Sequence, residues 1–237
     1  MASVADARAG TLSFWQKIAI GIAVFILFSF LQWAARGFVD IPAVPIWIHI
    51  HALAMVSWLG LFIIQPTLVK RDMLAWHRRL GRIGLALAAL IVGLGSFAAI
   101  MAIRTAHVPP FFTPAYFLAL THVSLAAFAG AVIAAVVTRR ATQTHRRFIV
   151  LATVLLMEPA YGRLLPMPLL GAWGETVGMF IQLGVLVLVA RHDERTLGHV
   201  HRATITGMIV VAAVHSLIEL LARFPVTAAL AGGIAGA

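Results

Sequence analysis

Cysteine is absent from the 237 residues of this chain, and charged residues make up only 11% of it. Without cysteine, the chain has no disulfide, no thiolate metal ligand and no cysteine nucleophile. The scarcity of charge, together with a hydrophobic content of 62%, falls outside the range of soluble domains. Any metal site must therefore use histidine, carboxylate or main-chain ligands, and the composition indicates a membrane protein.

Several enzyme signatures are also missing. There is no H-E-x-x-H sequence, no nucleophile elbow and no phosphate-binding loop. The pair Gly93 and Gly95 lies inside a hydrophobic run, where it is typical of helix packing and not of a dinucleotide-binding loop. The sequence alone therefore names no catalytic residue.

The chain is rich in hydrophobic runs that are long enough to cross a bilayer, which takes about 20 residues each. These runs lack both the polar face of a soluble helix and the strict alternation of a membrane strand. The sequence predicts an all-α polytopic membrane bundle, with residues 1–237 forming a single domain. The bundle should contain about seven transmembrane helices, at roughly 16–35, 46–68, 80–103, 114–138, 147–165, 174–191 and 203–222.

Proline and glycine predict the irregular segments. Glu158-Pro159 should kink the fifth run, because proline cannot continue the hydrogen-bond ladder of a helix. The stretch 164–173 contains two prolines and should form a surface or re-entrant turn. The Ala/Gly-rich tail at 224–237 is expected to be loose.

Positive charge is distributed unevenly over the loops. The formal net charge is +10, from 18 Lys and Arg against 8 Asp and Glu. Most basic residues fall at the N-terminus and in the second, fourth and sixth loops, and the other side has only Arg36, Arg104, Arg163 and Arg223. Because cytoplasmic loops are enriched in Lys and Arg, we expect a cytoplasmic N-terminus and a C-terminus outside. The partner of the basic loops is then a lipid bilayer and not a nucleic acid.

Four histidines lie at matching depths in two pairs of hydrophobic runs. His51 and His122 fall about two turns inside the second and fourth runs, and His77 and His145 fall at the starts of the third and fifth. Ionisable side chains at membrane depth are costly and mark functional sites by default. The two levels are roughly 24 Å apart along the helices, so they cannot share one metal ion.

Paired imidazoles from different helices are suited to bind b-type haem, because a neutral ring nitrogen can bind iron on each side of the macrocycle. We therefore expect His51 and His122 to hold an outer haem, and His77 and His145 an inner one. The predicted function is transmembrane electron transfer, with a redox protein or a quinone as partner. Arginines near the inner pair would bind the haem propionates: Arg78, Arg79, Arg82, Arg146 and Arg147.

Residues 47–150 resemble the ascorbate-reducible transmembrane cytochromes b. The similarity rests on the stretch from His51 to Trp58, on the block Trp76-His77-Arg78-Arg79-Leu80-Gly81, and on His122 and His145. The resemblance implies four consecutive helices over 46–165, each with one haem-ligating histidine. It also implies that the ligands pair between the first and third and between the second and fourth of these helices. The runs 16–35, 174–191 and 203–222 would flank this core.

A second resemblance covers most of the chain and implies no function. His49-Ile50-His51, Trp58, Gln65 and the block from His77 to Gly81 are similar to uncharacterised bacterial membrane proteins with seven helices. This resemblance implies a location in the bacterial inner membrane.

A metal-dependent membrane enzyme is the first alternative. His215 and Glu219 are four residues apart and share a helix face. With His51 and His122 they would form a site for Zn or non-haem Fe that leaves a position open for water.

A cofactor-free transporter or assembly factor is the second alternative. Glu158 and Arg163 are expected to pair with each other, because buried charges require partners. In this interpretation the pair and the histidines would handle protons.

Overall fold

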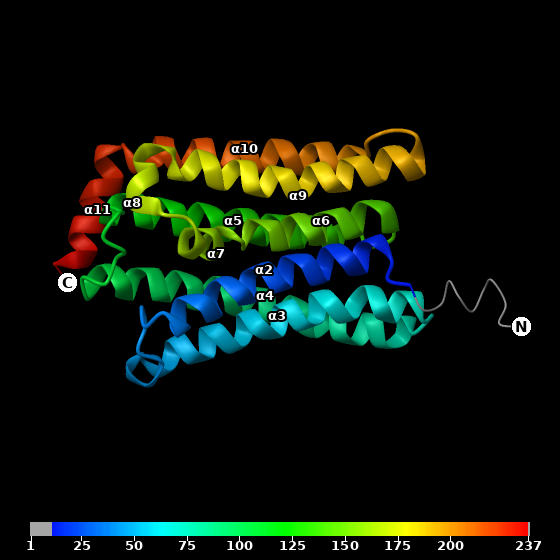
Figure 1. Ribbon diagram of the computed structural model, residues 1–237, viewed down its shortest axis with the longest axis horizontal. Coiled ribbons are helices and arrows are strands. Elements are labelled where there is room, and N and C mark those ends of the chain that lie inside the picture. The colour runs from blue at the N-terminus through cyan, green and yellow to red at the C-terminus, as the bar shows by residue number, and fades with distance from the viewer. Residues whose placement is uncertain (1–10, 237) are drawn as a thin grey trace, which may run out of the picture.

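The structure, a computed structural model, describes residues 11–236, and within them the chain is helical and contains no strand (Figure 1). The prediction of an all-α bundle is confirmed. The elements in chain order are α2 (Phe14–Ala35), η1 (Ile41–Ala43), α3 (Ile46–Lys70), α4 (Leu74–Arg104), α5 (Pro114–Val137), α6 (Thr142–Leu155), α7 (Glu158–Leu164), α8 (Met167–Leu170), η2 (Gly171–Trp173), α9 (Gly174–Leu197), α10 (Arg202–Ala222) and α11 (Pro225–Ala235).

Six helices among the described residues are long and apolar enough to cross a membrane, namely α2, α3, α4, α5, α9 and α10. The predicted fifth run is divided into α6 and α7, which meet at Leu156 and Met157. The break falls just before Pro159, whose ring cannot follow an uninterrupted helix. The expected kink at Glu158-Pro159 is therefore a full interruption, and the predicted fifth run is not one of the six long apolar helices.

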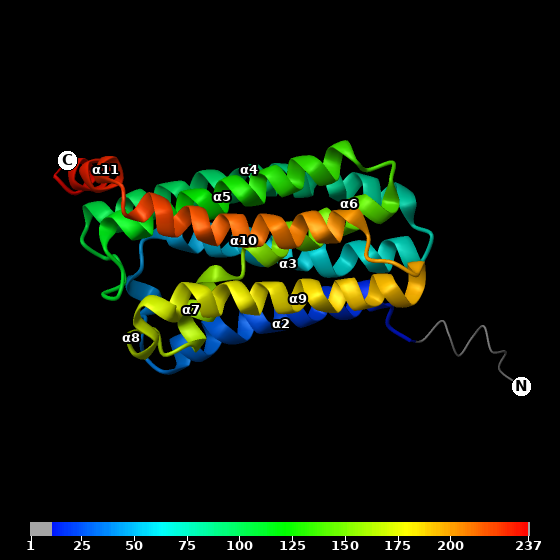
Figure 2. The same cartoon turned by 90° about the horizontal axis from the view of Figure 1, so that it is seen from above.

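The helices form two groups on either side of α5 and α6 (Figure 1). The hairpin of α9 and α10 packs on one side, where α10 contacts both α5 and α6. On the other side α3 packs against α4, α4 packs against α5, and α2 contacts α3, α6 and α7. Figure 2 shows the same bundle from above, with α2 and α9 along one edge and α4 and α5 along the other.

Large apolar side chains cover the outside of the bundle as well as its core. Leu31 of α2 is 68% exposed, and Ile209 of α10 is 63% exposed, whereas Ile22 and Val211 on the same helices are buried. In water such a surface would aggregate, but in a bilayer it faces lipid tails. The exposed apolar surface and the six long helices together indicate an integral membrane protein.

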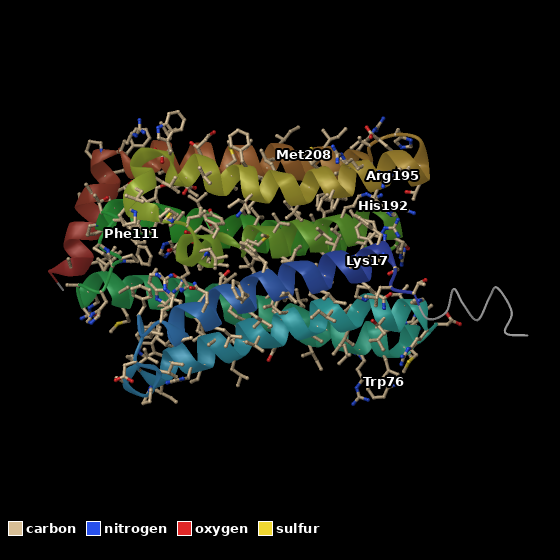
Figure 3. The ribbon with its side chains drawn as sticks, viewed as in Figure 1. Lys17, Trp76, Phe111, His192, Arg195 and Met208 are labelled. Carbon is tan, nitrogen blue, oxygen red and sulfur yellow. The ribbon has the colours of Figure 1, made fainter. Side chains whose placement is uncertain are left out.

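The two ends of the bundle differ in composition. Lys17, Trp76, His192 and Arg195 gather toward the end at which α3 ends and α4 begins, whereas Phe111 lies at the opposite end (Figure 3). We call these the basic end and the α11 end. The basic end is the one that the distribution of Lys and Arg assigns to the cytoplasm.

One of the two expectations about the connecting segments needs correction. Residues 225–235 form the helix α11, which packs on α4 and α5 and buries Thr227 and Ala231, so the tail described by the structure is not loose. Pro225 at its first turn has the fixed φ that a helix start favours. The turn predicted at 164–173 is present, and it contains the short helices α8 and η2.

Candidate cofactor site and buried polar networks

His77 and His145 come together at the basic end. The former lies in the first turn of α4 and the latter in the first turn of α6, and their ring centroids are 6.4 Å apart with an angle of 82° between the rings. Two imidazoles that share one metal ion each bind at about 2 Å from opposite sides. The structure thus brings the two predicted inner ligands into ring contact.

The carbonyl oxygen of Ala135 fixes the orientation of the His145 ring. Ala135 lies in the last turn of α5, where main-chain carbonyls lack partners within the helix, and its oxygen is 2.8 Å from His145 Nδ1. A carbonyl only accepts, so Nδ1 carries the hydrogen and donates it. The lone pair of a neutral His145 is therefore on Nε2, which is the arrangement typical of histidines that bind a metal.

His122 has the same arrangement at the other level. Its Nδ1 lies 2.9 Å from the carbonyl oxygen of Leu118, one turn earlier in α5, and donates to it. Its Nε2 lies 2.9 Å from Ser96 Oγ of α4, which donates the hydroxyl hydrogen to the free lone pair.

His51 of α3 and His122 of α5 both lie against α4. A Cβ on Gly95 would be 3.7 Å from His51 Cε1, and the next residue, Ser96, bonds His122. Both histidines are thus at one level, as predicted. Among the described residues, however, the rings of His77 and His145 are in contact and those of His51 and His122 are not. The sequence places His51 and His122 deeper in the membrane than His77 and His145. The ring contact nevertheless joins the shallower pair, His77 and His145.

In each pair, one histidine ring is oriented by a main-chain carbonyl and the other has a buried nitrogen without a hydrogen-bond partner. Nδ1 of His51 and Nδ1 of His77 are both buried and have no hydrogen-bond partner. Buried polar atoms are rarely left without a partner unless a water, an ion or a cofactor satisfies them. Gln65 adds a third such atom beside the inner pair, because its Nε2 donates to the carbonyl of His77 over 3.3 Å while its Oε1 is buried and unsatisfied.

The arginines expected at the propionates occupy three different environments. Arg78 and Arg79 are exposed, and Arg79 lies 5.3 Å from the ring of Trp76. Arg146 is partly buried and lies 4.3 Å from the ring of Trp15. Arg147, in contrast, is 2% exposed and forms an ion pair with Asp193. It is therefore bound to a carboxylate other than the haem propionates predicted for it.

Asp193 is the centre of a buried network that sequence reasoning missed. Its carboxylate is 0% exposed and accepts two N–H groups of Arg147, the hydroxyl of Thr204 at 2.5 Å and the main-chain N–H of His201 at 3.1 Å. His201 also caps α10, because its Nδ1 accepts from the N–H of Ala203. Burial and the nearby Arg147 lower the pKa of His201, which keeps this ring neutral. The network joins α6, α9 and α10.

A second buried network lies toward the α11 end. His215 Nδ1 is 2.5 Å from Glu175 Oε1, and both side chains are 5% exposed. Tyr116 Oη lies 3.0 Å from Glu175 Oε2 and 3.1 Å from Glu219 Oε1. His215 Nε2 lies 3.3 Å from Gln182 Oε1. A signal for this site was present in the sequence, since few of the hydrophobic runs contain acidic residues.

The alternative metal site predicted around His215 is not formed among the described residues. Among residues 11–236 there is no group of three or more His, Asp or Glu side chains that could hold a metal ion. His215 turns instead to Glu175, and Glu219 forms an ion pair with Arg223 at 2.8 Å. The proposed set of His51, His122 and His215 is therefore not brought together.

The expected pair of Glu158 and Arg163 is also not formed as an ion pair within the described chain. The guanidinium of Arg163 donates to the carbonyl of Pro159 at 2.6 Å and lies 4.2 Å from the ring of Phe30. An i, i+4 main-chain acceptor and an aromatic face satisfy the cation in place of the carboxylate.

Comparison with known proteins adds no relative to this description. No family model, no curated protein and no solved structure matches the chain. What the fold defines is an all-α polytopic membrane bundle, with a pair of histidines in ring contact at one end and two buried polar networks.

Proposed function

We propose that this protein is a b-type haem protein of the bacterial inner membrane that transfers electrons within or across the bilayer. The observation that carries the proposal is the pair His77 and His145, with ring centroids 6.4 Å apart and one ring oriented by a main-chain carbonyl. Two histidines, without a third His, Asp or Glu ligand among residues 11–236, are the donor set of a six-coordinate haem and not of a zinc site.

The residues around His77 fit a bound haem in two further respects. The buried and unsatisfied Nδ1 of His77 and Oε1 of Gln65 lie where a bound cofactor or its waters would satisfy them. The exposed Arg78 and Arg79 follow His77 directly and are free to bind carboxylate groups at the membrane surface. Haem, when bound, would supply one-electron chemistry, with a redox protein or a quinone as partner.

His51 and His122 are proposed as the second ligand pair. Both lie at the level of Gly95 and Ser96, and His122 is already the tautomer with a free lone pair on Nε2. For both rings to bind one iron, the hydroxyl of Ser96 must release Nε2. The outer site thus requires a rearrangement of one side chain that the inner site does not.

The test is the absorption spectrum of the detergent-purified protein, oxidised and then reduced with dithionite, from cells supplied with haem. We expect a Soret band and a reduced α-band in the native protein. His145→Ala should remove one haem per chain, because its Nε2 is the oriented ligand. His122→Ala should remove the other.

His199→Ala is the matched control, since His199 is exposed and bonds only the carbonyl of Leu197. Its haem content should equal that of the native protein. A native protein without visible absorption, or a His145→Ala variant with unchanged haem content, would sink the proposal.

A further inference from the structure

A chain of polar contacts connects the bundle interior with the α11 end. It begins at Gln182, which is 2% exposed, and passes through His215 and Glu175 to the hydroxyl of Tyr116. From there it reaches Glu219, whose side chain is 35% exposed. The chain draws on three helices, α9, α10 and α5, so the tertiary structure and not local sequence assembles it.

The hydroxyl of Tyr116 joins the two glutamates of this chain. Its phenol has one hydrogen, yet Oη lies within hydrogen-bond distance of both Glu175 and Glu219. One O–H can serve only one of these acceptors. The second contact is a hydrogen bond only if one carboxyl group is protonated and donates to Oη. The hydroxyl of Tyr116 is therefore placed to pass a proton between the two glutamates.

His215 also has two oxygen neighbours, one at each ring nitrogen. Its Nδ1 faces Glu175 Oε1 and its Nε2 faces Gln182 Oε1, so both ring nitrogens meet oxygen atoms. When both oxygens accept, both nitrogens carry hydrogen and the ring is a cation paired with Glu175. When the ring loses one proton, Glu175 is the nearest group that can receive it.

The surroundings of the chain leave one exit to the surface. Glu158 and Tyr161 of α7 interact electrostatically with Glu175, but Tyr161 Oη is buried and bonds nothing among the described residues. Glu219, by contrast, binds Arg223, whose side chain is 79% exposed. Glu219 is thus the member of the chain whose ion-pair partner lies at the surface.

Toward the basic end the chain is closed by an apolar layer. Gln182 and Asp193 are eleven residues apart on α9, and Thr204 and His215 are equally far apart on α10, so roughly 16 Å separates the two networks. The space between them is packed by buried apolar residues, including Leu186 and Leu151, each of which would lie 3.6 Å from a Cβ on Gly207. Apolar side chains therefore separate His215 from the network of Asp193.

We propose that the chain from His215 through Glu175 and Tyr116 to Glu219 is a proton-transfer path that exchanges protons between the bundle interior and the membrane surface at the α11 end. His215 Nδ1–H passes its proton to Glu175 Oε1, and Glu175 donates from Oε2 to Tyr116 Oη. Tyr116 passes its own hydrogen to Glu219 Oε1, and Glu219 releases a proton to water. Each O–H or N–H bond that breaks is matched by one that forms, and no electron is transferred.

The experiment measures how fast the ring protons of His215 exchange with water. The full chain, labelled with ¹⁵N-histidine, is studied by NMR in detergent micelles, and His215 is assigned from the signal that disappears in His215→Gln. Tyr116→Phe retains the ring and removes the hydroxyl that joins the two glutamates. We expect this variant to slow the exchange of His215 by about tenfold or more.

Tyr161→Phe is the matched control, because it removes a buried tyrosine hydroxyl that bonds nothing among residues 11–236. It should leave the exchange rate within about twofold of the native value. Glu219→Gln, at the partly exposed end, is a second variant that should slow exchange even if Tyr116→Phe fails to fold. Native exchange in Glu219→Gln, or equal slowing by Tyr161→Phe and Tyr116→Phe, would overturn the path.

Discussion

Main-chain carbonyls decide which ring nitrogen carries the hydrogen in His122 and His145. Leu118 O and Ala135 O each accept from Nδ1, which leaves the lone pair on Nε2 in both rings. The sequence could name these histidines because ionisable residues are rare in hydrophobic runs. It could not name their acceptors, because Ala135 is ten residues from His145 and belongs to another helix.

Gly178 of α9 is required for close approach of Tyr161. A Cβ at this position would lie 2.4 Å from two ring atoms of Tyr161, which is 1% exposed and cannot move aside. We expect Gly178→Ala to lower the free energy of unfolding by about 1–3 kcal/mol, because it overpacks the interior. A denaturant titration in mixed micelles measures the change.

Gly184→Ala, on the same helix, is the control, since a Cβ there meets nothing within 4 Å. It should be neutral or stabilise by up to about 1 kcal/mol, because alanine favours a helix more than glycine does. Equal destabilisation by the two substitutions would show that the approach of Tyr161 is not the cause.

The elements of the basic end are joined by the ion pair of Arg147 and Asp193. Arg147 lies in α6, Asp193 in α9, and Thr204 and His201 lie at the start of α10. A charge-assisted network of this kind holds the three helices together at the basic end.

Asp193→Asn should therefore be strongly destabilising. It leaves the guanidinium of Arg147 buried without a counter-charge, and the loss of one partner of a buried ion pair costs about 3–5 kcal/mol. The thermal midpoint of the purified protein should fall accordingly. Glu194→Gln, the exposed neighbour on the same helix, should unfold like the native protein. A small effect of Asp193→Asn, similar to that of Glu194→Gln, would contradict the role of the pair.

At the scale of the whole molecule, the described chain starts at the basic end and finishes at the α11 end (Figure 1). The distribution of Lys and Arg predicts that the basic end faces the cytoplasm. Because the chain contains no cysteine, a single introduced thiol reports on one position without background.

Arg140→Cys, in the loop between α5 and α6, should react with a membrane-impermeant maleimide only after the cells are opened. His107→Cys, in the loop between α4 and α5, should react in intact cells. Both positions are exposed. The opposite labelling pattern would invert the predicted orientation, and labelling of both positions from one side would contradict the arrangement of the bundle in the membrane.

The sequence by itself determined that this protein is a membrane helix bundle, because the length and apolarity of each run depend only on neighbouring residues. It also predicted a distortion near Pro159, which the structure shows as an interruption of the helix. Only the tertiary structure decided which side chains meet. Arg147 pairs with Asp193 and does not lie free at the predicted haem propionates, and His215 pairs with Glu175 and does not join the predicted metal site. A buried charged or polar group needs a partner, and the packing of distant helices decides which partner is within reach.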